Sequence, residues 1–138
     1  MSHAFVDTNI LIDLIADRKP FSRFAVELFE KAETNTVKLY TSSHSFATTH
    51  YLMKKYTGEK ELRALLSDLL YFITIIPVDL NVIQKSLRSS YKDFEDAIQI
   101  MAAQSVSKIS YLITRNIKDF RDCPIEVVAP DEFCSRVK

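Results

Sequence analysis

Two patterns of apolar residues alternate along the chain. Short runs rich in β-branched and aromatic residues predict β-strands, and longer stretches with an apolar residue every three or four positions predict helices with one buried face. The runs that predict strands are Ala4–Val6, Val37–Thr41, Ile73–Val78, Tyr111–Ile113 and Ile125–Val128. Because helical stretches separate these strands throughout, we expect α/β architecture with a central parallel sheet, a three-layer α/β/α sandwich.

Residues with strong positional preferences mark the ends of the predicted helices. Pro20 is placed in the first turn of one helix and Pro130 in the first turn of the last one. Ser42–Ser45 form a capping region for the helix after the second strand, and Gly58 is predicted to end that helix. Asp79 is predicted to cap the helix after the third strand.

The composition is that of one packed domain. The 138 residues are 47% apolar, so we expect a single domain spanning residues 1–138. The 18 Lys and Arg residues balance the 18 Asp and Glu residues, so no overall charge draws the chain to nucleic acid or membranes. No apolar stretch approaches the ~20 residues of a membrane span, and the N-terminus lacks a signal-peptide pattern. We therefore expect a cytoplasmic protein without membrane contact.

Gly58 is the single glycine of the chain. Phosphate-binding loops need glycines where the backbone approaches the phosphate, so the sequence excludes a P-loop, a dinucleotide-binding loop and a G-x-S-x-G nucleophile motif. Cys123 and Cys134 have no C-x-x-C spacing and no nearby histidine pair for a zinc site. Any phosphate chemistry must therefore depend on metal ions held by oxygen ligands.

Small polar and acidic residues gather where predicted strands end or helices begin. Asp7 follows the first strand, Ser42–Ser45 the second and Thr114–Asp119 the fourth, while Asp93 and Asp96 lie at the start of a helix. In a parallel sheet the carboxyl ends of the strands meet at one edge, where ligands bind. Carboxylates gathered there repel one another unless a cation lies between them. The pattern therefore predicts a metal site.

Each acidic residue also has a structural interpretation. Asp7 is equally suited to cap the helix that starts near Asn9. Asp93 and Asp96 are three positions apart and could compensate the dipole of a helix N-terminus. Asp96 is followed directly by an apolar stripe and should border the core, so it is the stronger candidate ligand, while Asp93 caps the helix or supports the site.

The segment after the fourth predicted strand also has two interpretations. It is either a polar turn, or it directs the Thr114 hydroxyl toward a metal-bound water or phosphate, with Asn116 or Asp119 completing an oxygen cage. Mg²⁺ and Mn²⁺ prefer carboxylate, carbonyl and water oxygens. A metal held in this way lowers the pKa of a bound water and stabilises the leaving oxygen of a phosphodiester, which is nuclease chemistry.

These residues resemble the PIN domain family of metal-dependent ribonucleases, which includes the VapC-type toxins of toxin–antitoxin pairs. The similar segments are Val6–Leu11, Phe94–Ile98 and Leu112–Phe120, in this order in a match that spans nearly the whole chain. The resemblance implies a parallel sheet between helices, one or two Mg²⁺ or Mn²⁺ ions, and RNA that is hydrolysed by a metal-activated water.

The resemblance also assigns site residues position by position. Asp7 and Asp96 match the first and third acidic positions of the family, and Asn116 falls at the fourth. The second acidic position, usually a glutamate, is Thr48 here, as in a branch of PIN-like proteins with a polar uncharged residue. Catalytic roles are expected for Asp7, Asp96, Asn116 and Asp119, metal binding for Asp7, Asp93, Asp96 and Asp119, and supporting roles for Asn9, Thr48 and Thr114.

We therefore expect a Mg²⁺- or Mn²⁺-dependent endoribonuclease. By resemblance it is the toxin of a toxin–antitoxin pair, with RNA, a small antitoxin protein and a second copy of itself as partners. The alternative is a PIN-like module that binds RNA or protein and whose acidic cage has decayed, as Thr48 and Asn116 indicate. His44 and His50 are interpreted as structural, because no Cys or second His stands at ligand spacing.

Overall fold

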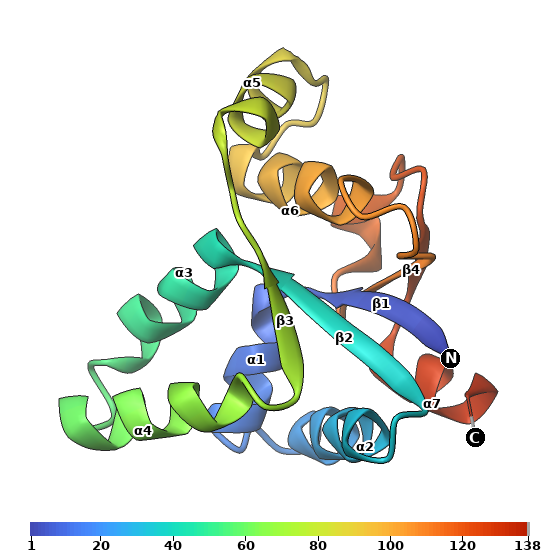
Figure 1. The fold of residues 1–138 in the computed structure, drawn as a ribbon. Coiled ribbons are helices and arrows are strands. Elements are labelled where there is room, and N and C mark those ends of the chain that lie inside the picture. Colours follow the sequence, from blue (N-terminus) through green and yellow to red (C-terminus); the bar gives the residue numbers. More distant parts are fainter. Residues whose placement is uncertain (138) are drawn as a thin grey trace.

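The computed structural model describes residues 1–137 and builds them around one parallel sheet (Figure 1). The strands are β1 (Ser2–Val6), β2 (Val37–Ser42), β3 (Ile73–Ile76), β4 (Tyr111–Ile113) and β5 (Glu126–Val128). The helices are α1 (Thr8–Ile15), α2 (Ser22–Glu33), α3 (Ser43–Met53), α4 (Glu59–Leu69), α5 (Leu80–Arg88), α6 (Phe94–Gln104) and α7 (Pro130–Arg136), with a 3₁₀ segment η1 (Ile117–Phe120). The predicted alternation of strands and helices is confirmed.

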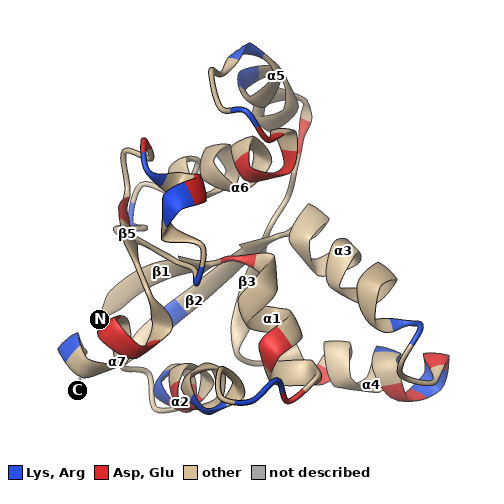
Figure 2. Ribbon diagram, turned by 180° about the vertical axis from the view of Figure 1, so that it is seen from behind, with Lys and Arg blue, Asp and Glu red and all other residues tan. Residues whose placement is uncertain are grey.

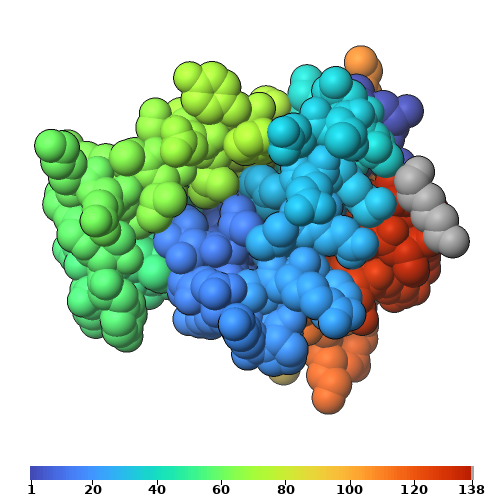
Figure 3. Space-filling model, turned by 90° about the horizontal axis from the view of Figure 1, so that it is seen from below, coloured from blue at the N-terminus to red at the C-terminus, as the bar shows by residue number. Residues whose placement is uncertain are grey.

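Helices cover both faces of the sheet, because successive residues of a strand point to opposite sides. Ala4 and Val6 of β1 pack with α1, α2, α4 and α7 in one core. Phe5 of the same strand packs with α5, α6 and η1 in a second core. Figure 3 shows the outside of the first layer, where the blue α1–α2 segment lies between the green α3–α4 segment and the red C-terminal segment. The predicted three-layer α/β/α sandwich is confirmed.

The strand order of the sheet reverses direction at β1. The order across the sheet is β3-β2-β1-β4-β5, so β2 and β3 lie on one side of β1 and β4 and β5 on the other. Val6 is in register with Ile113, and the Asp7 amide donates a hydrogen bond to the Ile113 carbonyl at 3.0 Å. Ligands bind outside the carboxyl ends of the strands at such a switch point. The fold therefore places Asp7 and the residues after β4 at the usual ligand edge.

Two predicted helix boundaries are wrong. Helix α3 ends at Met53, whose carbonyl accepts a hydrogen bond from the Thr57 amide. Gly58 does not end this helix but occupies the N-cap of α4 with extended backbone. Pro20 precedes α2, which begins at Ser22. The predicted caps at Ser42 and Asp79 are confirmed by side-chain hydrogen bonds, and Pro130 lies in the first turn of α7.

The helices are short. Helix α2 has 12 residues, and α3, α4 and α6 have 11 each. A membrane-spanning helix needs ~20 apolar residues. Within residues 1–137, no helix has the length and apolar character that crossing a membrane requires.

Candidate functional site

Asp7 lies between the end of β1 and the start of α1 and is only 4% exposed. Asp7 occupies the N-cap position of α1, as the capping interpretation predicts, but its side chain makes no capping hydrogen bond. Instead, Oδ1 accepts a hydrogen bond from Gln99 Nε2 at 3.0 Å, and Oδ2 accepts one from the Thr114 hydroxyl at 2.7 Å. The orientation of this carboxylate is therefore fixed from two sides, by α6 and by the residue that follows β4.

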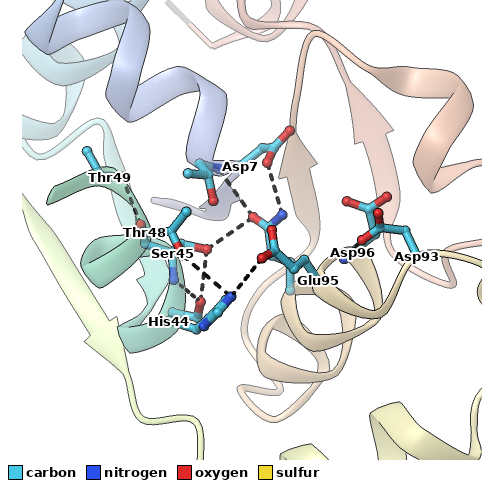
Figure 4. A network of polar contacts seen from close by, with 11 residues as sticks. Asp7, His44, Ser45, Thr48, Thr49, Asp93, Glu95 and Asp96 are labelled. Atoms are coloured by element: carbon cyan, nitrogen blue, oxygen red, sulfur yellow. Dashed lines mark hydrogen bonds and ion pairs between the residues drawn. The ribbon is translucent and has the colours of Figure 1, made fainter. Parts of the chain in front are cut away.

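Gln99 and Ser45 extend the network from Asp7 to α3 (Figure 4). Gln99 Oε1 accepts hydrogen bonds from the Thr8 amide at 3.2 Å and from the Ser45 hydroxyl at 3.3 Å. The Ser42 hydroxyl donates to Ser45 Oγ at 2.9 Å, and it also accepts the Ser45 amide as the cap of α3. Every buried side-chain N or O atom within residues 1–137 has a hydrogen-bond partner, so this polar region is fully satisfied.

Thr114 is completely buried behind Asp7. Its Oγ1 accepts a hydrogen bond from the Asn116 amide at 2.9 Å and donates to Asp7, so the hydroxyl serves the carboxylate and not an open solvent position. Burial raises the pKa of the Asp7 carboxyl group, and the hydrogen bonds from Thr114 and Gln99 lower it. The predicted supporting role of Thr114 therefore takes the form of a direct bond to Asp7.

An acidic cleft lies beside this network, between the start of α6 and η1. It has a volume of about 370 Å³ and is lined by Asp93, Asp96 and Asp119 together with the basic residues Lys92, Lys118 and Arg121. In Figure 2 the start of α6 is red, whereas the 3₁₀ segment that contacts α6 carries both blue and red residues. The cleft therefore offers carboxylates for a cation and cationic side chains for an anion.

Asp96 is the residue on which the charges of the cleft act most strongly. Burial and the nearby carboxylates of Asp93, Asp7, Asp119 and Glu95 raise its pKa to about 7. Like charges this close disfavour ionisation, and a bound cation would relieve the repulsion. The electrostatics of the cleft therefore match a cation site with Asp96 at its centre.

The predicted cage of Asp7, Asp93, Asp96 and Asp119 is not formed as one cluster. Within residues 1–137, no three His, Cys, Asp or Glu side chains are close enough to hold a metal ion by themselves. Asp7 is buried in its own network, the Asp93 carboxylate accepts the Asp96 amide at 3.0 Å as the cap of α6, and Asp119 is exposed. The donor set still fits Mg²⁺ or Mn²⁺, because Mg²⁺ is often held by one or two carboxylates, water and a substrate phosphate.

Thr48 faces α6 from the middle of α3. Its hydroxyl lies 3.5 Å from His44 Nε2, and the same nitrogen lies 3.6 Å from Glu95 Oε1. Figure 4 shows His44 between Thr48 of α3 and Glu95 of α6. A carboxylate therefore approaches the position of the missing acid, but it comes from α6 and not from α3.

An ion pair with a buried carboxylate fixes the segment that follows Thr114. Arg115 donates two hydrogen bonds to the Asp13 carboxylate, with Nε at 2.6 Å and Nη2 at 3.0 Å. The Asp13 side chain is 1% exposed, and the Arg115 guanidinium also lies 3.9 Å from the centre of the Phe21 ring. Arg115 thus ties the loop after β4 to α1 and α2.

The sequence analysis named the acidic residues of this region but not the residues that join them through hydrogen bonds. Asp93, Asp96 and Asp119 share the cleft, and Asp7 and Thr114 lie behind it, whereas Asn116 is exposed and Asn9 is half-buried on α1. The prediction missed Gln99 and Ser45, which complete the network. Gln99 lies one helical turn after Asp96 within an otherwise apolar stripe. A lone polar residue in such a stripe needs a buried partner, and this feature of the sequence could have identified Gln99.

Comparisons with known proteins agree with this fold. The sequence matches the family model described as PIN domain over residues 3–118. A curated relative, Ribonuclease VapC1 from Aquifex aeolicus (strain VF5), is 28% identical over 137 residues, which make up 96% of this chain and 93% of that protein. The similarity therefore extends over nearly the full length of both sequences.

Solved structures give the same picture. A chain in a toxin–antitoxin complex from Klebsiella pneumoniae is 34% identical, with a TM-score of 0.64 over 92% of this chain and 97% of that one. A chain of VapBC2 from Rickettsia felis, solved bound to a DNA fragment from its promoter, is 20% identical, with a TM-score of 0.69 over 92% and 98% of the two chains. The second likeness supports the fold alone.

Proposed function

Because this chain belongs to the PIN domain family, we propose that it is a divalent-metal-dependent endoribonuclease that hydrolyses phosphodiester bonds in RNA. The observation that carries the proposal is the acidic cleft, where burial and neighbouring carboxylates raise the pKa of Asp96 to about 7. A relative named as a ribonuclease over nearly the same length supports the assignment. The cleft is the place where RNA and a cation would meet.

Asp7 and Asp96 would hold the cation, with Asp119 at the open side of the cleft. The cation, Mg²⁺ or Mn²⁺, would supply a water of lowered pKa and stabilise the charge on the phosphate. Lys118 and Arg121 line the same cleft and would bind the phosphates of the RNA. Thr114 and Gln99 each donate a hydrogen bond to one oxygen of Asp7 and so fix the orientation of its carboxylate. The remaining lone pairs of the two oxygens therefore have fixed directions.

The same family membership extends the proposal to a toxin that acts in the cytoplasm and is restrained by a small antitoxin protein. A 34% identical chain occurs in a toxin–antitoxin complex and supports this role. A toxin that cleaves RNA would harm the cell that makes it unless a partner restrained it. The antitoxin would therefore be expected to cover the acidic cleft or hold its walls apart.

A second copy of the chain is a further proposed partner. Leu80, Ile83 and Leu87 form an apolar stripe on α5 and are 69%, 37% and 67% exposed. Two α5 helices packed antiparallel would bring each Leu80 to a Leu87 and each Asp79 to an Arg88 of the other copy. This self-complementary pattern of apolar and charged residues favours a homodimer through α5.

Cleavage of labelled single-stranded RNA tests the proposal, with the wild type compared with Asp96→Asn in Mg²⁺, Mn²⁺ or chelator. We expect metal-dependent cleavage that falls by at least about a hundredfold in the variant, because a group that stabilises the transition state is lost. Asp68→Asn, the same change at an exposed position of α4, is the matched control. Equal cleavage by both variants and the wild type would contradict the assignment.

Thr48 and the absence of a three-residue cage within residues 1–137 favour one second candidate, a PIN-like module that binds RNA or protein without cutting. Such a module would show RNA binding in the presence of chelator and no cleavage in either metal. The cleavage assay combined with a binding assay on the same RNA separates the two functions.

A further inference from the structure

Gln99 is a buried polar residue that joins Asp7 to two other elements of the site network. It lies on α6, is 4% exposed, and makes hydrogen bonds to Asp7, Thr8 and Ser45 at 3.0, 3.2 and 3.3 Å. These partners come from the end of β1, the start of α1 and α3. A polar side chain this deep costs free energy unless its groups are bonded. Here the Gln99 amide nitrogen donates to the Asp7 carboxylate, and its oxygen accepts from Thr8 and Ser45.

The direction of these hydrogen bonds follows from the partners. The Thr8 amide can only donate, so it must face the Gln99 oxygen, and the Gln99 amino group must then face Asp7 Oδ1. On the other side, the Thr114 hydroxyl accepts the Asn116 amide and donates its own hydrogen to Asp7 Oδ2. Both oxygens of Asp7 therefore accept one hydrogen bond from the protein, and the positions of both are fixed.

We propose that Gln99 is a positioning residue that orients the Asp7 carboxylate toward the cation of the acidic cleft. The inference rests on the function proposed above. A carboxylate offers about four lone-pair sites, and the bonds from Gln99 and Thr114 use two of them. The remaining sites are held in one orientation, which spares the ion the cost of ordering Asp7 when it binds.

A neutral amide suits this position for a second reason. Asp7, Asp93, Asp96 and Glu95 already place several negative charges around the cleft. Gln99 orients Asp7 through an amino group and adds no charge to that set. The Gln99 oxygen accepts a hydrogen bond from the Ser45 hydroxyl of α3. The same side chain therefore holds α3 and α6 on either side of Asp7.

The test measures Mn²⁺ binding to the RNA-free protein by calorimetry, together with kcat and KM for RNA cleavage. Gln99→Met keeps the length of the side chain and removes both hydrogen-bonding groups. We expect its Kd for Mn²⁺ to rise by about tenfold or more, as for other residues that orient metal ligands. We expect kcat to fall while KM for RNA stays within about twofold, because Lys118 and Arg121 are untouched.

Two further variants keep the result interpretable. Gln104→Met makes the same substitution at an exposed position of α6 and should leave Mn²⁺ binding and cleavage unchanged. Gln99→Asn retains an amide on a shorter side chain that cannot span the distance to Asp7, and it carries the test where Gln99→Met does not fold. Gln99→Met and Gln99→Asn should both bind Mn²⁺ more weakly than the wild type if Gln99 orients Asp7.

The outcomes separate the two levels of the proposal. A lowered melting temperature with Mn²⁺ affinity and kcat within about twofold of the wild type would show a merely structural glutamine and overturn the inference alone. A folded wild type that binds no Mn²⁺ and cleaves no RNA would overturn the proposed function and this inference together.

Discussion

Asp96 is ionised at a cost in the metal-free protein, because its carboxyl group shares the cleft with other acids. Its pKa is raised to about 7 by burial first and then by Asp93, Asp7, Asp119 and Glu95. The hydrogen bond from its amide to Asp93 does not compensate, since it involves the backbone and not the carboxylate. An ionised Asp96 therefore favours cation binding but lowers the stability of the metal-free protein.

The pH dependence of stability tests this conflict. Since the native Asp96 keeps a proton that the unfolded chain releases, the contribution of Asp96 to stability without metal is fully present below its ordinary pKa of 3.8. This contribution is lost as pH rises toward about 7. Asp96→Asn removes this loss. At about pH 8 with chelator we expect the variant to be more stable by about 1–2 kcal/mol, a value reduced for screening at a half-buried group. Urea denaturation at about pH 4 and about pH 8 measures the difference. Parallel pH profiles for the two proteins would contradict the prediction.

Thr48 is where a carboxylate can be added back. Thr48→Glu would place a new acid on α3 opposite Glu95 and Asp96, and we expect Mn²⁺ affinity to increase by about tenfold. Thr48→Gln has the same size without the charge and is the control. Calorimetry with RNA-free protein gives both values, and equal affinities for the Glu and Gln variants would show that position 48 does not face the cation.

At the scale of elements, the loop after β4 is held in place by its contacts with α1. Arg115 and Asp13 form a bidentate ion pair in which the carboxylate is buried. This pair fixes the residue next to Thr114, and Thr114 in turn bonds Asp7. The position of the loop after β4 therefore depends on an ion pair with α1.

Arg115→Met tests this connection. The change leaves the Asp13 carboxylate buried without its partner, so we expect the free energy of unfolding to fall by about 3–5 kcal/mol. Asp13→Leu combined with Arg115→Met removes both charges and should recover most of the loss. Urea denaturation of the single and double variants gives the energies, and a double variant as unstable as Arg115→Met would mean that the charges are not the cause.

The pattern of elements was predictable from the sequence because each strand and helix carries its own periodicity. The helix end at Met53 was not, since Gly58 serves an extended N-cap as readily as a helix stop. In the site, Asp7 and Asp96 were visible as acids at the ends of elements. Gln99 was not, because its partners lie in α1, α3 and β1, and only the folded topology brings them together.

At the scale of the whole molecule, one helical layer carries both the acidic cleft and an exposed apolar stripe. Helices α5 and α6 form one layer, and the loop between them supplies Ser90, Tyr91 and Lys92 to the wall of the acidic cleft. The apolar stripe of α5 lies directly before that loop. Association through α5 would therefore bring the cleft of one copy near the second copy.

Leu87→Glu tests self-association. A charge within the apolar stripe would be buried against the second copy, so we expect the variant to be a monomer where the wild type is a dimer. Leu70→Glu is the control, because Leu70 follows α4 and is 51% exposed, compared with 67% for Leu87. Light scattering after size exclusion gives the masses, and an unchanged dimer in Leu87→Glu would rule out α5 as the contact.

The hydrogen bonds that complete the site join parts of the chain made at very different times. Asp7 is bonded to Gln99 and Thr114, which are 92 and 107 positions away in the sequence. Synthesis proceeds from the N-terminus, and early segments cannot form contacts with residues that do not yet exist. An unfinished chain therefore lacks the completed site, and RNA cleavage can begin only after Thr114 has been made.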